Sequence, residues 1–151
     1  MTPKLKLSIM EVLYKAKATS RGGRGGNVKS ADGILNLELR PPKEMGGEEG
    51  YNNPEQLFAA GYAACFDSAM EFMARRHKLD VSDADLIVEI GIGRDPSGEG
   101  YRLEADITGV FPKGITDAQA EQLMNEAHGF CPYSRAVKGN IDVRLHHTIK
   151  S

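Results

Sequence analysis

The sequence carries little net charge, lacks any long apolar run, and contains few cysteines. A formal net charge of −2 gives no global basic field that would attract nucleic acid or an anionic membrane. No apolar run reaches the length of a membrane span, and residues 1–18 lack the apolar core and cleavage site of a signal peptide. We therefore expect a cytoplasmic protein that binds neither nucleic acid nor membrane.

Cysteine occurs only twice, at Cys65 and Cys131. A reducing cytosol does not normally leave two such thiols as a passive structural disulfide. Free cysteine is also among the most buried residue types, so the two residues are either core fillers or reactive groups. The residues taken one at a time leave both interpretations open.

Length and hydrophobic patterning predict a single α+β domain covering residues 1–151. Alternating apolar residues predict strands over residues 12–19, 33–40, 86–93, 101–110 and 141–149. Asn53 and Pro54 are typical of a helix start, and residues 57–73 are apolar nearly all round, as in a buried helix. A second helix is predicted from a capping box at Thr116 to about Phe130.

Residues 21–26 read RGGRGG and lie between two predicted strands. RNA-binding segments of this type are usually repetitive and basic, whereas this one is a single copy in a slightly acidic chain. A phosphate-binding loop would have to feed a helix, but a strand follows here. Two interpretations remain: a flexible hairpin tip with solvated arginines, or a tight glycine turn that directs an arginine inward.

Cys65 lies eleven residues after Pro54 (65 − 54 = 11), about three turns into the predicted helix. The helix dipole acts only near the first turn, so it does not lower the pKa of this thiol. A nucleophilic Cys65 needs a cation from elsewhere, because only the thiolate attacks. Arg24, flanked by glycines, is a candidate, and Glu55 could fix its guanidinium in a bidentate pair.

Three histidines, His128, His146 and His147, are candidate metal ligands or catalytic groups. His128 and Cys131 have an H-x-x-C spacing, but two residues do not make a metal site, and we expect no metal and no cofactor. His146 and His147 are expected on opposite faces of the last strand, in ordinary surface and core roles. Cys131 sits beside Pro132 at a helix end, which suits a resolving cysteine and equally an inert buried thiol.

Three segments together resemble a known family. These are NPEQLFAAGYAACF (residues 53–66), GGRGG (residues 22–26), and CPYS followed by GN-DV (residues 131–134 and 139–143). In this order, over nearly the whole chain, they resemble the organic hydroperoxide resistance proteins, the Ohr branch of the Ohr/OsmC superfamily. Arg135 stands where the family commonly has asparagine.

The resemblance implies an OsmC-like fold, with antiparallel sheets around a long buried central helix, in an intertwined homodimer. It implies a thiol peroxidase that reduces organic hydroperoxides to alcohols and is itself reduced by dihydrolipoamide or a lipoylated protein. By matching motifs, Cys65 is the peroxidatic cysteine, Cys131 the resolving one, and Arg24 and Glu55 the activating pair. The alternatives are an OsmC-type peroxidase of broader peroxide range and an RNA-binding module using residues 21–26.

Two further expectations follow. An apolar pocket would favour alkyl and lipid hydroperoxides, with candidate wall residues Phe66, Met70, Met73 and Phe130. Ten residues separate Glu55 from Cys65 (65 − 55 = 10), which is about 15 Å on an unbroken helix. Either the helix breaks near Gly61, or the Glu55 that serves a given Cys65 belongs to a partner subunit, which is the interpretation we favour.

Overall fold

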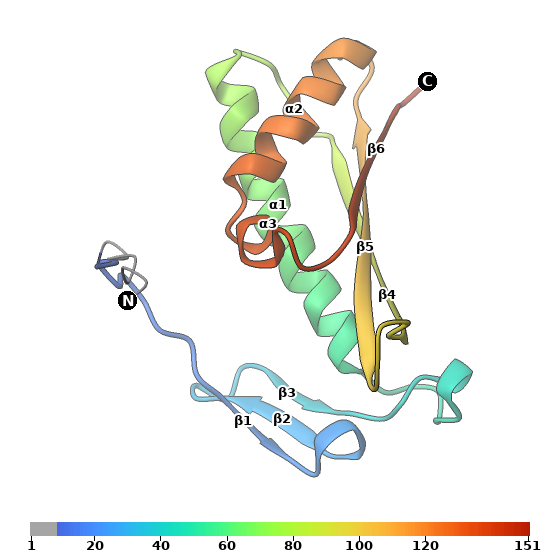
Figure 1. Ribbon diagram of the computed structural model, residues 1–151. Helices are drawn as coiled ribbons and strands as arrows, with labels where there is room; N and C mark the ends of the chain where they lie inside the picture. Colours follow the sequence, from blue (N-terminus) through green and yellow to red (C-terminus); the bar gives the residue numbers. More distant parts are fainter. Residues whose placement is uncertain (1–8) are drawn as a thin grey trace, which may run out of the picture. The chain divides into compact units, whose positions relative to one another are not determined.

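The computed structural model describes residues 9–151 and confirms the α+β class, with helices and two three-stranded sheets (Figure 1). The chain forms two compact units, Met1–Asn53 and Pro54–Ser151, which we call the N-terminal and C-terminal units. The first contains the RGGRGG segment and the second contains both cysteines. None of the helices among residues 9–151 is long and apolar enough to cross a membrane.

The N-terminal unit is an antiparallel sheet in the order β1-β2-β3. Its strands are β1 (Ala18–Arg21), β2 (Asn27–Ser30) and β3 (Asn36–Glu38), followed by a short 3₁₀ turn, η2 (Lys43–Met45). The strand predicted over residues 33–40 is confirmed in its central part, and Gly33 makes the preceding turn with a φ of 76°.

The strand predicted over residues 12–19 is wrong for residues 12–17, which have no regular structure. Val12, Leu13 and Tyr14 are exposed, with Leu13 at 90%. Strand β2 ends at Ser30, opposite Ala18, so residues 12–17 have no partner strand in β2 to pair with, and their apolar side chains are not buried.

The C-terminal unit alternates helices with the strands of the second sheet. In chain order its elements are α1 (Pro54–Arg76), β4 (Asp85–Arg94), β5 (Tyr101–Phe111), α2 (Asp117–Phe130), α3 (Pro132–Val137) and β6 (Val143–Ile149). Strands β4 and β5 form an antiparallel hairpin, whereas β5 and β6 are parallel. The expectation of purely antiparallel sheets is therefore wrong for the last pair, because α2 and α3 make the crossover that parallel pairing requires.

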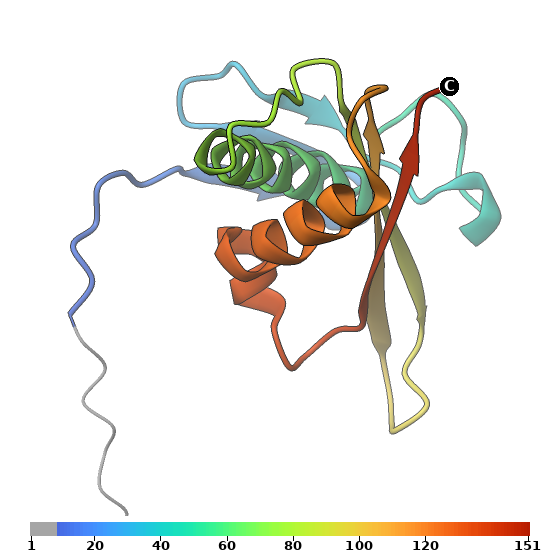
Figure 2. The ribbon, with the colours of Figure 1, turned by 90° about the horizontal axis from the view of Figure 1, so that it is seen from above.

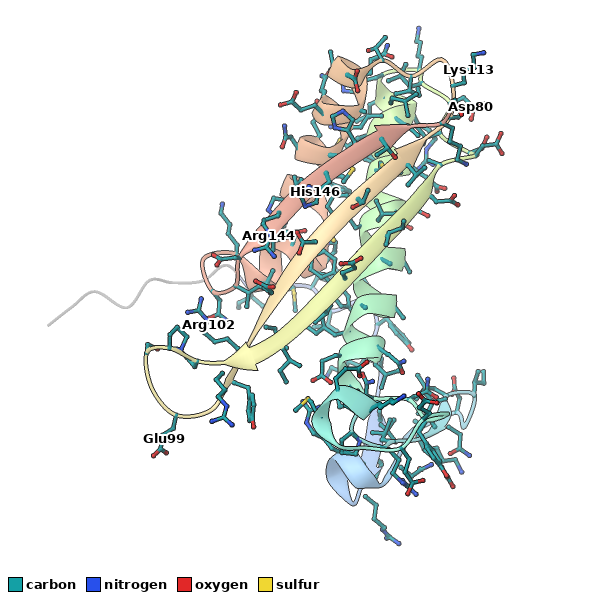
Figure 3. The ribbon with its side chains drawn as sticks, turned by 90° about the vertical axis from the view of Figure 1, so that its right-hand side faces the viewer. Asp80, Glu99, Arg102, Lys113, Arg144 and His146 are labelled. Carbon is teal, nitrogen blue, oxygen red and sulfur yellow. The ribbon has the colours of Figure 1, made fainter. Side chains whose placement is uncertain are left out.

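The core of this unit lies between the sheet and the helices α1 and α2, which pack side by side on one face (Figure 2). Tyr62, Phe66 and Met70 enter it from α1, while Ile107 and Phe111 enter from β5, and all five are fully buried. The opposite face of the sheet is polar. There Arg144 and His146 of β6 (Figure 3) both bind Asp106 of β5.

Helix α1 is buried on one side only, although its sequence is apolar nearly all round. Ala60, Ala64 and Ser68, spaced one turn apart, are exposed. The expectation of a fully buried helix is thus not met by the single chain. The stripe is composed of small residues and leaves room for another backbone to approach closely.

Helix α2 begins and ends where the sequence predicts. Thr116 accepts a hydrogen bond from the Gln119 backbone at 3.1 Å, and the Gln119 side chain accepts one from the Thr116 backbone at 3.0 Å. Cys131 then leaves the helical conformation, with φ −62° and ψ 125°, and Pro132 starts α3. Helix α3 was not predicted, and its first residue places Cys131 at a junction between two helices.

Candidate functional site

The two cysteines lie together in the C-terminal unit. Cys65 is half-buried on α1, Cys131 is fully buried between α2 and α3, and both are free thiols. Cys131 belongs to the buried core cluster and Cys65 packs against that cluster, and Cys131 and the Tyr133 backbone both influence the pKa of Cys65. The structure therefore brings together two thiols that are 66 residues apart (131 − 65 = 66) in the sequence.

The surroundings of Cys65 raise the pKa of its thiol above the usual range. Burial is the largest cause, and neighbouring Cys131 acts in the same direction. The hydrogen bond from the Tyr133 backbone lowers the pKa and partly offsets burial. Within its own unit Cys65 thus rests as a neutral thiol, as the position in mid-helix predicts, and its ionisation needs a positive group.

An aromatic cluster surrounds the thiol pair. The Tyr133 ring lies 5.6 Å from the Tyr62 ring and 6.1 Å from the Phe58 ring, between centroids. Gly61 makes this packing possible, because a Cβ at this position would lie 2.5 Å from the Tyr133 hydroxyl. The glycine in the middle of α1 therefore serves close approach of Tyr133.

Three polar side chains are linked by hydrogen bonds, with Tyr62 and Ser134 buried and His128 half-buried. The Tyr62 hydroxyl lies 2.6 Å from Ser134 Oγ, and His128 Nδ1 lies 2.9 Å from the same oxygen. Burial raises the pKa of Tyr62 and lowers that of His128, and Lys138 lowers the latter further. Both side chains are therefore neutral at pH 7.

The RGGRGG segment forms the loop between β1 and β2, with Arg24 inside the 3₁₀ turn η1 (Gly23–Gly25). Gly22 and Gly23 have positive φ values of 84° and 58°, and a Cβ on Gly26 would overlap the Arg21 carbonyl. The predicted tight glycine turn is thus confirmed, but Arg24 is exposed in the single chain, so its inward orientation stays a prediction. Sequence reasoning missed Arg40, whose guanidinium donates to the Gly25 carbonyl at 2.8 Å and fixes the loop.

Glu55 lies in the first turn of α1, a helix that continues without interruption to Arg76. The proposed break near Gly61 is therefore wrong. On this unbroken helix Glu55 and Cys65 are separated by about 15 Å along the axis, so a single arginine head group of the same chain does not readily reach both.

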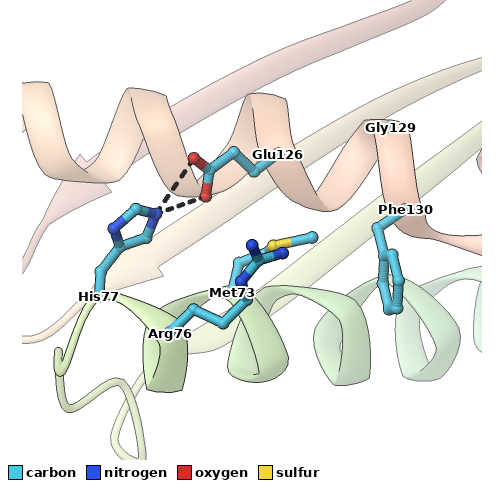
Figure 4. Close-up of a pocket in the computed structure, with 6 residues that line it drawn as sticks. All are labelled: Met73, Arg76, His77, Glu126, Gly129 and Phe130. Atoms are coloured by element: carbon cyan, nitrogen blue, oxygen red, sulfur yellow. Dashed lines mark hydrogen bonds and ion pairs between the residues drawn. The ribbon is translucent and has the colours of Figure 1, made fainter.

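The four residues predicted to line a substrate pocket have different environments. Phe66 and Met70 are fully buried in the core, and Met73 is 8% exposed. Phe130 is 47% exposed, and its ring stacks on Phe72 with centroids 4.8 Å apart. Met73 and Phe130 line a pocket of about 400 Å³ (Figure 4) whose other residues are Arg76, His77, Glu126 and Gly129.

That pocket is more polar than the sequence suggests. His77 Nε2 lies 2.8 Å from a carboxylate oxygen of Glu126, and Figure 4 shows this pair facing the pocket beside Arg76. Its apolar side chains are Met73, in the middle beside Arg76, and Phe130 at the end away from His77 (Figure 4).

His146 and His147 lie on opposite faces of the last strand, as expected, but both pair with carboxylates outside the core. His146 binds Asp106 at 2.9 Å on one face of β6, and His147 binds Asp117 at 3.1 Å on the other. His128 reaches Ser134. Residues 9–151 contain no group of three or more histidine, cysteine, aspartate or glutamate side chains that could hold a metal ion.

Sequence reasoning did not identify Tyr62, Tyr133 or Ser134 as part of the site. A signal was present: Tyr62 and Cys65 are three residues apart, as are His128 and Cys131, and Cys131 and Ser134. Within a helix such spacing places side chains on one side, which applies to Tyr62 and Cys65 on α1 but not to Cys131, which lies between two helices. It does not reveal that α3 exists, and α3 is what brings Tyr133 and Ser134 to α1.

Comparison with known proteins places this geometry in a family. Residues 46–146 match the family model described as OsmC-like protein. The chain belongs to this family. The Ohr branch is also confirmed, because an organic hydroperoxide resistance protein of Xanthomonas axonopodis pv. citri is 45% identical over 137 residues, covering 89% of this chain and 94% of that protein.

Solved structures of the Ohr branch have the same fold. An organic hydroperoxide resistance protein from Elizabethkingia anophelis gives a TM-score of 0.86 at 43% identity, covering 93% of this chain and 100% of the other. A putative organic hydroperoxide resistance protein from Vibrio cholerae, with captopril bound in one of its active sites, gives 0.84 at 43% identity, covering 93% and 95%. The OsmC-like fold predicted from the sequence is therefore confirmed.

Proposed function

We propose that this Ohr-branch chain is a thiol peroxidase that reduces organic hydroperoxides to alcohols in the cytoplasm. The names of the related proteins support the substrate class. One observation supports the cysteine mechanism: Cys65 packs against the core cluster that contains Cys131, and Cys131 lies close enough to affect the pKa of Cys65. This proximity favours a disulfide between them.

The first step oxidises Cys65. Its thiolate attacks the terminal oxygen of the hydroperoxide, an S–O bond forms, and the O–O bond breaks. The alkoxide leaves, takes up a proton and becomes the alcohol, while Cys65 is left as a sulfenic acid. Because burial raises the pKa of Cys65, the thiolate needs a cation, and we assign this role to Arg24, which also stabilises the developing alkoxide charge.

The second step uses Cys131. Its sulfur attacks the Cys65 sulfur, the S–S bond forms, and the hydroxyl leaves with the thiol proton as water. An external dithiol of the lipoyl type then reduces the disulfide by exchange and is itself oxidised to a disulfide. The cycle needs no metal or cofactor bound to the protein.

The proposed enzyme is a homodimer with two active sites. In each site, Glu55 of one subunit orients the Arg24 that activates the Cys65 thiol of the partner. The unbroken α1 and the exposed stripe of Ala60, Ala64 and Ser68 support this arrangement. The Vibrio cholerae relative, described with a ligand in one of its active sites, has more than one site.

For the alkyl group of the substrate, the partly exposed rings nearest Cys65 are the best candidates. Tyr133 is 38% exposed, its backbone lowers the pKa of Cys65, and Phe58 packs against it. Roles of Phe66, Met70, Met73 and Phe130 in substrate binding stay predictions. Phe66 and Met70 would need the core to open before they met a ligand.

The test is turnover of cumene hydroperoxide with dihydrolipoamide, measured against hydrogen peroxide as substrate and glutathione as reductant. We expect rapid turnover only with the organic peroxide and the dithiol, and none in Cys65→Ser. Equal rates with both peroxides would favour the OsmC-type enzyme of broader range. Absence of peroxide consumption under all four conditions would refute the proposal.

A further inference from the structure

A chain of hydrogen bonds joins three helices beside the two thiols. Tyr62 belongs to α1, Ser134 to α3 and His128 to α2, and Ser134 Oγ is the shared partner of the other two. Tyr62 is 0% exposed and Ser134 is 1% exposed. Water therefore cannot replace the Tyr62–Ser134 hydrogen bond. If that bond is lost, a buried polar group is left without a partner.

The three hydrogen-bonded side chains come from the same helical segments that carry or flank the two cysteines. Tyr62 precedes Cys65 by three residues on α1, so both side chains lie on the same side of that helix. His128 precedes Cys131 by three residues and Ser134 follows it by three. The hydrogen bonds thus connect the helix that carries Cys65 to the helical segments on both sides of Cys131.

One direction of donation is favoured in the hydrogen bonds among Tyr62, Ser134 and His128. Ser134 has one hydroxyl proton, so it donates to one partner and accepts from the other. If Tyr62 donates to Ser134 and Ser134 donates to His128 Nδ1, both hydroxyl protons have an acceptor. In the reverse order the Tyr62 proton would need a third acceptor, so the first order is favoured and the His128 proton lies on Nε2.

Helix α3 depends on such contacts for its position. It has six residues, and isolated helices of this length are not stable in water. Ser134 is its only buried residue, so the bonds to Tyr62 and His128 are a main anchor. The same helix carries the Tyr133 backbone N–H and begins directly after Cys131.

We propose that Tyr62, Ser134 and His128 are positioning residues that hold the Cys131 junction against Cys65, and that they thereby set the rate of disulfide formation. The inference rests on the proposed function, because it concerns the step in which Cys131 attacks the oxidised Cys65. That step competes with further oxidation of the sulfenic acid by a second peroxide. A loosened α3 would shift the outcome towards sulfinic acid.

The experiment compares His128→Leu, which removes the acceptor, with His128→Asn, whose side-chain oxygen can take the place of Nδ1. After one equivalent of cumene hydroperoxide, mass spectrometry follows the Cys65 sulfenic acid and the Cys65–Cys131 disulfide separately in time. We expect at least a tenfold slower second step in His128→Leu and in Ser134→Ala, with the first step changed less than threefold. His128→Asn should stay within about threefold of the wild type in both steps.

His77→Leu and His77→Asn are the matched controls, because His77 also contacts α2 but through an exposed pair with Glu126. Both should form the disulfide at the wild-type rate. Equal slowing in His128→Leu and His128→Asn would overturn the inference, as would an unchanged second step in Ser134→Ala.

A second arm separates this inference from the proposed function. Oxidised glutathione places a mixed disulfide on Cys65, and attack by Cys131 then releases glutathione and forms the same internal disulfide without peroxide. A wild type that is inert to cumene hydroperoxide but forms this disulfide would refute only the peroxidase function. Wild-type rates of glutathione release in Ser134→Ala would refute only the positioning role.

Discussion

Cys65 packs against the buried cluster that contains Cys131 and lies close enough for Cys131 to raise its pKa, although one belongs to the middle of α1 and the other to the junction of α2 and α3. Cys131 is fully buried while Cys65 is half-buried. An oxidant from solvent therefore meets Cys65 first, and the buried thiol is ready to react with the product. This asymmetry assigns different roles to two residues of the same chemistry.

Replacing Cys131 with serine should separate the two steps. The first oxidation of Cys65 remains, because the thiol that meets peroxide is intact. Turnover with dihydrolipoamide should stop, and mass spectrometry should find sulfinic and sulfonic acid at Cys65 as peroxide is added. Cys65→Ser is the matched control and should give neither product. Sustained turnover in Cys131→Ser would mean that Cys131 is only a core residue.

Arg24→Ala should raise the pKa of Cys65 further and slow the attack on peroxide. Each unit of pKa corresponds to about 1.4 kcal/mol between the thiol and thiolate forms, and loss of a hydrogen-bond donor to a developing anion typically costs a hundredfold or more in rate. Arg21→Ala is the control from the same loop and should behave as wild type. The measurements are thiolate absorbance against pH and single-turnover rates. If the two variants behave alike, Arg24 has no special role.

Acid should destabilise the protein partly through His128. Burial holds the pKa of this histidine below its ordinary value of 6.5, so the unfolded chain binds a proton more readily than the folded one. The stability associated with a neutral His128 is therefore fully present above pH 6.5. It is lost as the pH falls through the lowered pKa of the folded state. Urea unfolding between pH 7.5 and 5 should show this decline, and it should flatten in His128→Asn. An unchanged slope in that variant would contradict the assignment.

The sequence predicts the long elements of this fold because each has a local signal. Thr116 with Gln119 fixes the start of α2, Asn53 with Pro54 marks the start of α1, and β4 and β5 alternate clearly. The strand predicted over residues 12–19 forms only from Ala18 onward, because alternation says nothing about whether a partner strand lies opposite.

The site itself is only partly predictable from the sequence. Cys65 and Cys131 stand out as the only two thiols, whereas the contact between them depends on the packing of α3, a six-residue helix without a strong local signal. The role of Arg40 is equally hard to predict. Its hydrogen bond to the Gly25 carbonyl joins residues fifteen positions apart (40 − 25 = 15) and depends on how the backbone folds.

Gly61→Ala tests whether the close approach of Tyr133 matters for chemistry. The added Cβ would lie 2.5 Å from the Tyr133 hydroxyl, so the ring must move. We expect this movement to displace α3, whose Tyr133 backbone lowers the pKa of Cys65. We therefore expect slower disulfide formation and a higher pKa of Cys65. In helix interiors alanine is favoured over glycine by about 1 kcal/mol, and the displaced ring should cancel much of this gain.

Gly129→Ala is the control, because a Cβ at this position of α2 meets no atom within 4 Å. It should stabilise the protein by up to ~1 kcal/mol in urea unfolding and leave both oxidation steps unchanged. The comparison separates helix propensity from the contact with Tyr133. Equal stabilisation by the two substitutions, with wild-type disulfide formation in both, would mean that the Tyr133 side chain moves aside without disturbing the thiol pair.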